Sequence, residues 1–285
     1  MITFIDCNNL CYRAFYATGN MAYGGNPTGV VFGFLNQLFT IYKNYGPSIT
    51  PVFCWDSPKS LRRDVCPTYK RKGGEATPEQ IEGRLEAYRQ FDEVRTRVLP
   101  ALGFGNLIFR EEGFEADDLI AFGCANLNVD KFKMIVSSDE DLFQCLRNYV
   151  KIFNPGSNQQ FTDIDFNTSF NITPDLWPHV KAIAGCSSDN VIGVQGVGEK
   201  TAIKYLTGEL SFSNKKYNVI KQFVKSKEYE TNFQLVKLPY IGSKFTMEVK
   251  MPELKKEAFI DVFDRYGLES FFKRMSTISI NLWLN

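Results

Sequence analysis

Acidic residues follow three short apolar runs of the sequence, directly in two cases and after two serines in the third. The runs and the acids that follow them are residues 2–5 with Asp6, residues 51–55 with Asp56, and residues 133–136 with Asp139. Apolar runs of this length are typical of buried β-strands. If the strands are parallel, their carboxyl ends lie at one edge of a sheet, where α/β proteins place their ligands. We therefore expect these carboxylates, although distant in sequence, to meet at one site.

Further acids are expected at the same place. Glu115, Asp117 and Asp118 open a predicted helix over residues 115–127, and Asp141 follows shortly after the third of the strand-end acids. So many carboxylates stay ionised together only when cations neutralise them, because like charges raise one another's pKa. A set of oxygen ligands favours Mg²⁺ or Mn²⁺. Each acid alone could be a helix cap or a turn residue, and only the whole set predicts a metal site.

A basic segment follows the second predicted strand. Residues 59–72 hold six Lys or Arg against one acid, whereas the whole chain has a formal net charge of +1. Cations beside an aromatic ring can hold a phosphate and stack on a base, and the residues concerned are Arg62, Tyr69, Lys70, Arg71 and Lys72. A solvated surface loop is the alternative. Because two glycines and a long predicted helix from Thr77 follow, we expect an element that projects over the acids.

A glycine-rich turn precedes a predicted helix in the second half of the chain. Its members are Gly193, Gly196 and Gly198, followed by Lys200 and Thr201. Glycines at a helix start leave backbone N–H groups free to hold a phosphate. The turn is not a P-loop, because a glutamate separates the last glycine from the lysine. A simple helix cap is the alternative interpretation.

The elements that must position these residues divide the chain in two. Strands are predicted at residues 2–5, 51–55, 106–109 and 133–136, and helices at 29–45, 77–102, 115–127, 174–184, 200–206, 215–225, 228–238 and 253–265. Alternation of strand and helix predicts an α/β fold with a mostly parallel central sheet covered by helices. The chain becomes mainly helical after residue 170. Residues 240–251 could be a strand or an extended connection.

Composition excludes several other classes of protein. Seven scattered cysteines without a C-x-x-C pair argue against a disulfide framework or a zinc ribbon, and they fit a reducing cytoplasm. The single histidine, His179, argues against a His-based zinc site and against a catalytic triad. No apolar stretch approaches the ~20 residues that span a bilayer. We expect a protein without membrane partners.

Taken together, these motifs resemble those of the flap endonucleases and 5′-3′ exonucleases of bacteriophages and of the N-terminal part of bacterial DNA polymerase I. The resemblance covers nearly the whole chain and is carried by Asp6, residues 12–16, residues 27–29, Asp56, Arg62, Tyr69, Lys70, residues 115–118, Asp139, Asp141, Asp189, Asn190 and residues 193–201. It implies a PIN-like 5′ nuclease core over 1–170, with an arch or gateway at about 57–100. Residues 171–285 would carry a helix-two-turn-helix that grips duplex DNA.

The resemblance also implies a role for each residue. A first metal would be served by Asp6, Asp56, Glu115, Asp117 and Asp139, and a second by Asp141 and Asp189, with Asp118 as a supporting residue. Lys70 and Arg62 would act on the scissile phosphate and Tyr69 would stack on the terminal base. Arg71, Lys72 and the turn from Gly193 to Thr201 would bind DNA, with a K⁺ ion often found at such a turn. The implied activity is hydrolysis of DNA phosphodiesters at 5′ ends or flaps.

Two positions depart from the family pattern. Cys186 stands where a carboxylate of the second metal site is expected, and Gly73 stands where a basic residue is usual. Because thiols suit Mg²⁺ poorly, we predict a weakened second metal site with a preference for Mn²⁺. We expect a monomer in the cytoplasm, that of the host if a phage encodes it, working beside a replication polymerase or a single-strand-binding protein. The alternatives are a DNA-binding accessory protein with weak or lost cleavage and a related small RNase.

Overall fold

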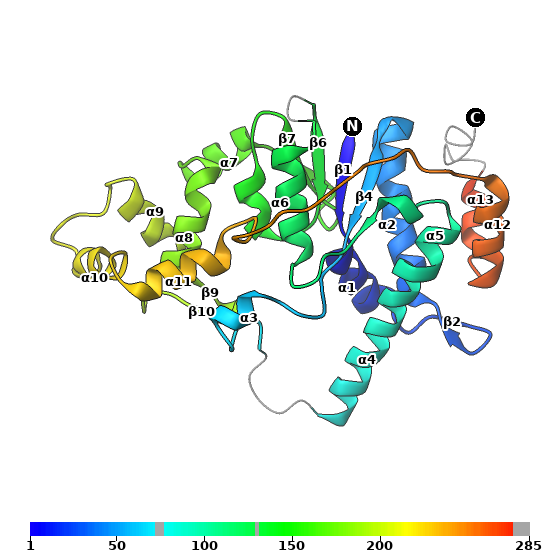
Figure 1. Ribbon diagram of the computed structural model, residues 1–285, viewed down its shortest axis with the longest axis horizontal. Helices are drawn as coiled ribbons and strands as arrows, with labels where there is room; N and C mark the ends of the chain where they lie inside the picture. The colour runs from blue at the N-terminus through cyan, green and yellow to red at the C-terminus, as the bar shows by residue number, and fades with distance from the viewer. Residues whose placement is uncertain (72–76, 129–130, 276–285) are drawn as a thin grey trace.

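The computed structural model describes residues 1–71, 77–128 and 131–275, which form a sheet with helices on both faces (Figure 1). The strands are β1 (Ile2–Asp6), β2 (Ala22–Tyr23), β3 (Asn26–Pro27), β4 (Thr50–Cys54), β5 (Ile108–Phe109), β6 (Lys133–Val136), β7 (Val150–Asn154), β8 (Gln159–Phe161), β9 (Gly185–Cys186) and β10 (Val191–Ile192). The α-helices are α1 (Cys7–Thr18), α2 (Gly29–Tyr45), α3 (Arg62–Val65), α4 (Pro78–Glu93), α5 (Leu99–Ala101), α6 (Ala116–Asn126), α7 (Asp163–Phe170), α8 (Trp177–Ala184), α9 (Glu199–Leu206), α10 (Lys215–Phe223), α11 (Lys227–Val236), α12 (Lys256–Arg265) and α13 (Glu269–Met275).

The six-stranded central sheet confirms the predicted fold class. Its strand order is β5-β4-β1-β6-β7-β8, and every pair is parallel except β7 with β8. Strand β1 lies between β4 and β6, with Ile2 opposite both Thr50 and Lys133. The carboxyl ends of these three strands therefore lie at one edge of the sheet. Strand β5 is shorter than predicted, because residues 105–107 form a 3₁₀ turn before it.

Alternating residues of the strands face two hydrophobic cores, as the period of two requires. Ile5, Phe53 and Val136 belong to the core shared with α1, α2 and α4, whereas the intervening residues belong to the core shared with α6 and α8. Helices α12 and α13 return to the first core, where Phe263 meets Phe39 of α2 edge to face. The division at residue 170 therefore separates two regions of sequence, not two separately packed units.

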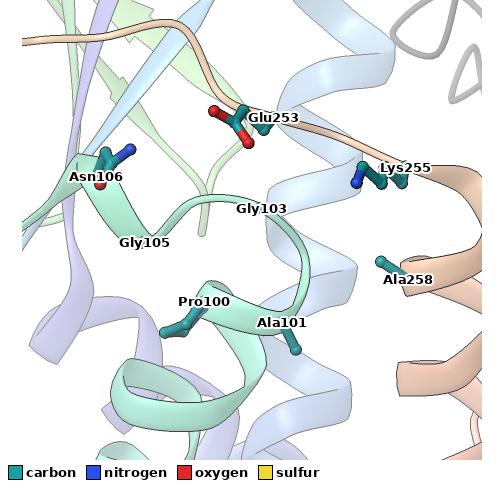
Figure 2. A pocket seen from close by; sticks show the side chains of 8 residues that line it. All are labelled: Pro100, Ala101, Gly103, Gly105, Asn106, Glu253, Lys255 and Ala258. Carbon is teal, nitrogen blue, oxygen red and sulfur yellow. The ribbon is translucent and has the colours of Figure 1, made fainter.

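Residues 240–251, for which the sequence left open a strand or an extended connection, contain no strand. They are part of an extended connection that crosses the molecule from α11 to α12 (Figure 1). Near its end the Glu253 amide donates to the carbonyl of Gly103, whose φ of +92° and close contact with the connection exclude a side chain there. A cavity of about 310 Å³ beside this contact contains none of the predicted site residues (Figure 2). Within the described ranges, no helix is both long and apolar enough to cross a bilayer.

Candidate metal and nucleic-acid site

The carboxyl ends of the parallel strands bring the predicted acids together. Asp6 is the last residue of β1 and the N-cap of α1, where its carboxylate accepts from the Asn9 amide at 3.0 Å. The same carboxylate accepts from the hydroxyl of Ser137, which directly follows β6, at 2.8 Å. Asp56, just after β4, accepts from the Ala116 amide at 2.8 Å and so ties the sheet to the start of α6. The parallel sheet thus brings Asp6 and Asp56 to one edge, where backbone amides and the Ser137 hydroxyl hold their carboxylates.

Four acids form one group, which we call the strand-end group: Asp6, Asp56 and Asp139 follow or end strands β1, β4 and β6, and Asp117 lies in the first turn of α6. Burial, reinforced by Asp56 and Asp139, raises the pKa of Asp6 to about 7. Burial also raises the pKa of Asp117 well above its ordinary value, and Asp139 and Asp6 add to the effect. No member forms an ion pair with any residue that the structure describes. The group therefore holds negative charge that a bound cation would stabilise.

Lys70 lies at the margin of this group. Its ammonium donates to Glu115 Oε2 at 2.9 Å, and its backbone N–H donates to the Asp189 carbonyl at 2.9 Å. Lys70 has a φ of +51°, a conformation that costs a non-glycine residue about 1 kcal/mol or more and is often found at functional sites. The pKa of Glu115 would be raised by its burial, but Lys70 and Arg62 hold it below the ordinary value. Glu115 therefore stays ionised beside the lysine.

Tyr69 does not lie where the resemblance placed it. Its side chain is only 2% exposed, and its hydroxyl donates to Glu115 at 3.2 Å and to Asp189 at 3.1 Å. A ring buried in this way has no open face on which a terminal base could stack. Tyr69 instead joins two acids that come from α6 and from the turn after β9.

Arg62 and Asp118 form a buried pair, which differs from the predicted action of Arg62 on the phosphate and leaves Asp118 as a supporting residue. The Arg62 guanidinium binds both carboxylate oxygens of Asp118, at 2.7 and 2.8 Å, and its Nε donates to the Leu235 carbonyl at 2.8 Å. Asp118 also accepts from the amides of Glu115 and Tyr240. With every oxygen occupied, Asp118 cannot bind a metal, and Arg62 cannot reach a scissile phosphate. The pair instead fixes the start of α6 against the segment after α11.

We expect Arg62→Met to lower the free energy of unfolding by about 3 to 5 kcal/mol, because it leaves the Asp118 carboxylate buried without its counter-charge. Urea denaturation measures this loss. The matched control is Arg89→Met, which removes an exposed arginine paired with Glu86 at 3.5 Å. Such surface pairs contribute about 0 to 1 kcal/mol. A loss for Arg62→Met no larger than that of the control would contradict the structural role of the pair.

A second cluster lies beside the strand-end group, and we call Asp141, Cys186 and Asp189 the Cys186 group. One ligand atom from each lies within 4.8 Å of the others. The Lys181 ammonium lies 3.2 Å from Asp141 Oδ1, and the Cys186 thiol lies 3.0 Å from the Ser188 hydroxyl. Burial, then the Asp141 charge, raises the pKa of the Cys186 thiol. The cluster therefore contains the thiol that the sequence indicated, and also an internal cation, Lys181, that the sequence did not indicate.

A cavity of about 500 Å³ opens next to Lys70 and joins α1, the basic segment and α4. Aromatic and basic side chains line it, and among them are Tyr12, Tyr16, Tyr88, Arg63, Arg71 and Arg84. Tyr16 is 78% exposed and Tyr88 is 50% exposed, so both rings are available to a ligand. Arg71 was predicted to bind DNA, whereas the tyrosines and Arg84 were given no role. Arg84 and Tyr88 stand four residues apart in α4, and this spacing, which places both on one face of a helix, was the signal for them. Lys72 and Gly73 lie outside the described residues.

The glycine turn lies between β10 and α9, and the short antiparallel pair of β9 and β10 separates it from α8. Gly196 has a φ of +71°, and a side chain on Gly193 would collide with the Ala184 backbone. The Lys216 ammonium, from α10, donates to the Gly196 carbonyl. Helix α9 begins at Glu199, so Lys200 and Thr201 lie in its first turn. These residues do not touch the strand-end group; the ion pair of Lys181 with Glu199, at 3.1 Å, joins them to the Cys186 group.

Comparisons with known proteins agree with this geometry. Residues 1–171 match the family described as "5'-3' exonuclease, N-terminal resolvase-like domain". The chain is 29% identical to a 5′-3′ exonuclease of Aquifex aeolicus over 88% of each chain. It is 31% identical to DNA polymerase I of Mycobacterium leprae, where the match covers 72% of this chain and 22% of the polymerase.

Solved structures share the fold. A zinc-bound T5 5′-exonuclease gives a TM-score of 0.70 at 21% identity, covering 84% of this chain and 89% of that one. Human GEN1 in complex with Holliday junction DNA gives 0.57 at 18% identity, covering 94% of this chain and 67% of that one.

Proposed function

The chain belongs to the 5′-3′ exonuclease family, and on that premise we propose that it is a divalent-metal-dependent 5′ nuclease. It hydrolyses DNA phosphodiesters at 5′ ends or 5′ flaps during replication or repair. The observation that carries the proposal is the strand-end group, whose carboxylates converge at one edge of the sheet without an ion pair to any described residue. Polymerase activity is not proposed, because the match spans only 22% of the DNA polymerase I relative.

The strand-end group has the chemistry that a divalent ion requires. The ion would be served, directly or through water, by Asp6, Asp56, Glu115, Asp117 and Asp139. Oxygen ligands of this kind favour Mg²⁺ or Mn²⁺. When bound, the ion would polarise the phosphoryl oxygen and promote ionisation of the attacking water. Lys70 would supply a fixed positive charge where the phosphate becomes more negative. The 3′ oxygen would then leave, and the product would carry a 5′-phosphate.

The DNA would contact two surfaces. The aromatic and basic cavity beside Lys70 suits the single-stranded part, because rings stack on bases of any sequence and arginines neutralise the backbone. The glycine turn and the lysines of α9 and α10 suit the duplex part, whose phosphates helix starts can bind. A K⁺ ion at the turn belongs to the same proposal. We further propose a cytoplasmic monomer that cooperates with a replication polymerase or a single-strand-binding protein.

We expect Tyr16→Ala to weaken binding of a 5′-flap DNA by about 1 to 3 kcal/mol, because it removes one exposed stacking ring. Fluorescence anisotropy with a flap substrate and a blunt duplex of equal length measures this. Affinity for the blunt duplex should not change. Tyr149→Ala, which removes a partly exposed ring that packs against Phe132, is the control. Equal weakening of both DNAs would assign Tyr16 to the duplex surface instead of the cavity.

Cleavage of end-labelled 5′-flap, 3′-flap and single-stranded RNA substrates tests the proposal. We expect cutting of the 5′-flap DNA with Mg²⁺ or Mn²⁺, none with EDTA, and a 5′-phosphate on the product. Preferential cutting of RNA would favour an RNase. Tight flap binding without cutting in either metal would favour an accessory protein, an alternative that the thiol of Cys186 at a metal-binding position specifically supports.

A further inference from the structure

The Cys186 group already contains its own cation. Lys181, on the inner side of α8, is only 9% exposed, and its ammonium lies 3.2 Å from Asp141 and 3.1 Å from Glu199. The ammonium also lies 5.3 Å from the centre of the Trp177 ring. Contacts from three sides hold the charge in place, whereas an exposed lysine would sample many positions. Asp141 is therefore neutralised by the protein itself.

The remaining members of the group are poor ligands for a hard divalent ion. The Cys186 sulfur lies 3.0 Å from Ser188 Oγ and 4.0 Å from Asp141 Oδ2. The longer distance allows only a weak hydrogen bond. A neutral thiol is a weak ligand for Mg²⁺ and supplies no negative charge. One oxygen of Asp189 accepts from the buried Tyr69 hydroxyl at 3.1 Å. The Lys181 ammonium is the cation that directly contacts this cluster, and it is shared between Asp141 and Glu199.

The strand-end group presents the opposite balance. Its carboxylates lie at the carboxyl ends of neighbouring parallel strands and in the first turn of α6, and none of the four has an ion pair with a described residue. A divalent ion at that group would relieve repulsion between acids. At the Cys186 group, the same ion would have to approach or displace a fixed ammonium, and like charges a few ångströms apart repel strongly away from bulk water. A divalent ion would therefore be stabilised at the strand-end group and opposed by the Lys181 ammonium at the Cys186 group.

We propose that the Lys181 ammonium takes the place of a second divalent ion, so that this chain holds one divalent ion, at the strand-end group. The inference rests on the proposed function and deepens it, because it makes the nuclease a one-metal enzyme. Lys181 acts as a positioning residue through Asp141. Cys186 and Lys181 work together: the thiol contributes no negative charge to the cluster, and the ammonium offsets part of the charge of Asp141.

Counting Mn²⁺ bound to the full chain tests this directly. Electron paramagnetic resonance of free Mn²⁺ gives the stoichiometry, with and without a 5′-flap DNA that carries a non-hydrolysable linkage, after subtraction of ions bound by the DNA alone. The proteins compared are wild type, Lys181→Arg, Lys181→Met, Cys186→Asp and the double variant Lys181→Met/Cys186→Asp. Lys151→Met is the control, because the ammonium of Lys151 bonds to Gln160 and contacts neither cluster.

The expected result is one Mn²⁺ for wild type, Lys181→Arg and Lys151→Met, and two for the double variant. Affinity for the second ion should rise by about 10- to 100-fold in the double variant, the size of effect that residues around a metal site produce. Two ions of similar affinity in the wild type would overturn the inference while leaving the nuclease intact. No bound ion in the wild type would instead overturn the proposed metal dependence. Circular dichroism identifies any variant that fails to fold. If the double variant does not fold, Lys181→Arg, which keeps the positive charge, should still bind one Mn²⁺, and two bound ions would contradict the inference.

Discussion

Asp139→Asn is expected to lower single-turnover cleavage of a 5′-flap DNA by about a thousandfold or more, because it removes charge from the site that activates the attacking water. Asp139 is a stringent test because asparagine preserves its shape. Its Oδ1 accepts from the Asp141 amide at 2.8 Å, and an amide oxygen can accept the same bond. The change therefore removes one negative charge with little disturbance of the loop. Binding of the DNA should be unchanged or tighter, because the substrate is itself anionic.

Asp261→Asn is the matched control for this prediction. Asp261 is an exposed residue of α12, remote from the strand-end edge, and its replacement should leave both cleavage and affinity unchanged. Rapid-quench assays at saturating protein measure the chemical step, and anisotropy measures the affinity. A decrease in cleavage of less than tenfold for Asp139→Asn would show that this carboxylate does not hold the essential metal.

Lys70→Met is expected to lower the rate of the chemical step by about 10²- to 10³-fold, the size of effect found when one charge-stabilising donor is removed. Burial would lower the pKa of Lys70, but Glu115 and then other nearby acids raise it well above its ordinary value, so the side chain stays cationic. Its strained backbone and its bond to the Asp189 carbonyl fix where this charge lies. A charge so placed acts on the reacting phosphate more than on DNA affinity.

Lys59→Met is the control for Lys70→Met, because Lys59 belongs to the same basic segment. Its ammonium pairs with Glu112 at 2.7 Å, and both side chains are exposed. The loss of this lysine should weaken affinity slightly and leave the chemical step unchanged. If Lys70→Met raised the KM for the flap DNA and left the single-turnover rate unchanged, the role of Lys70 would be DNA binding and not the chemical step.

The sequence allowed the strand-end site to be predicted because the relevant information is local. Apolar runs of four or five residues predicted β1, β4 and β6, and the parallel topology then required Asp6, Asp56 and Asp139 to meet. Strands β7 and β8 were missed because polar residues interrupt them, as in Gln159–Phe161. Strand β8 is an antiparallel edge strand, where little burial is needed and the hydrophobic pattern is weak.

Side-chain partners from distant parts of the chain could not be predicted in the same way. Arg62 and Tyr69 were assigned to the substrate because their types suit phosphate and base, yet the fold buries both. Arg62 donates to the carbonyl of Leu235, which is 173 positions away in the sequence, and Tyr69 donates to Asp189, which is 120 positions away. The pairing of Lys181 with Asp141 is likewise set by how α8 packs beside the sheet edge. Residue type alone does not tell whether a cation serves the substrate or the protein.

The most direct measurement is the rate at which the wild-type chain cuts a 5′-flap DNA as Mg²⁺ or Mn²⁺ is added, with flap binding measured in parallel and Cys186→Asp as the comparison. The strand-end site predicts that the wild type cuts only when metal is added, and that the cleavage rate saturates with metal concentration as expected for one bound ion. Tight binding of the flap with no cutting under either metal, together with cleavage by Cys186→Asp, would contradict it. The chain would then be a DNA-binding module on a nuclease fold.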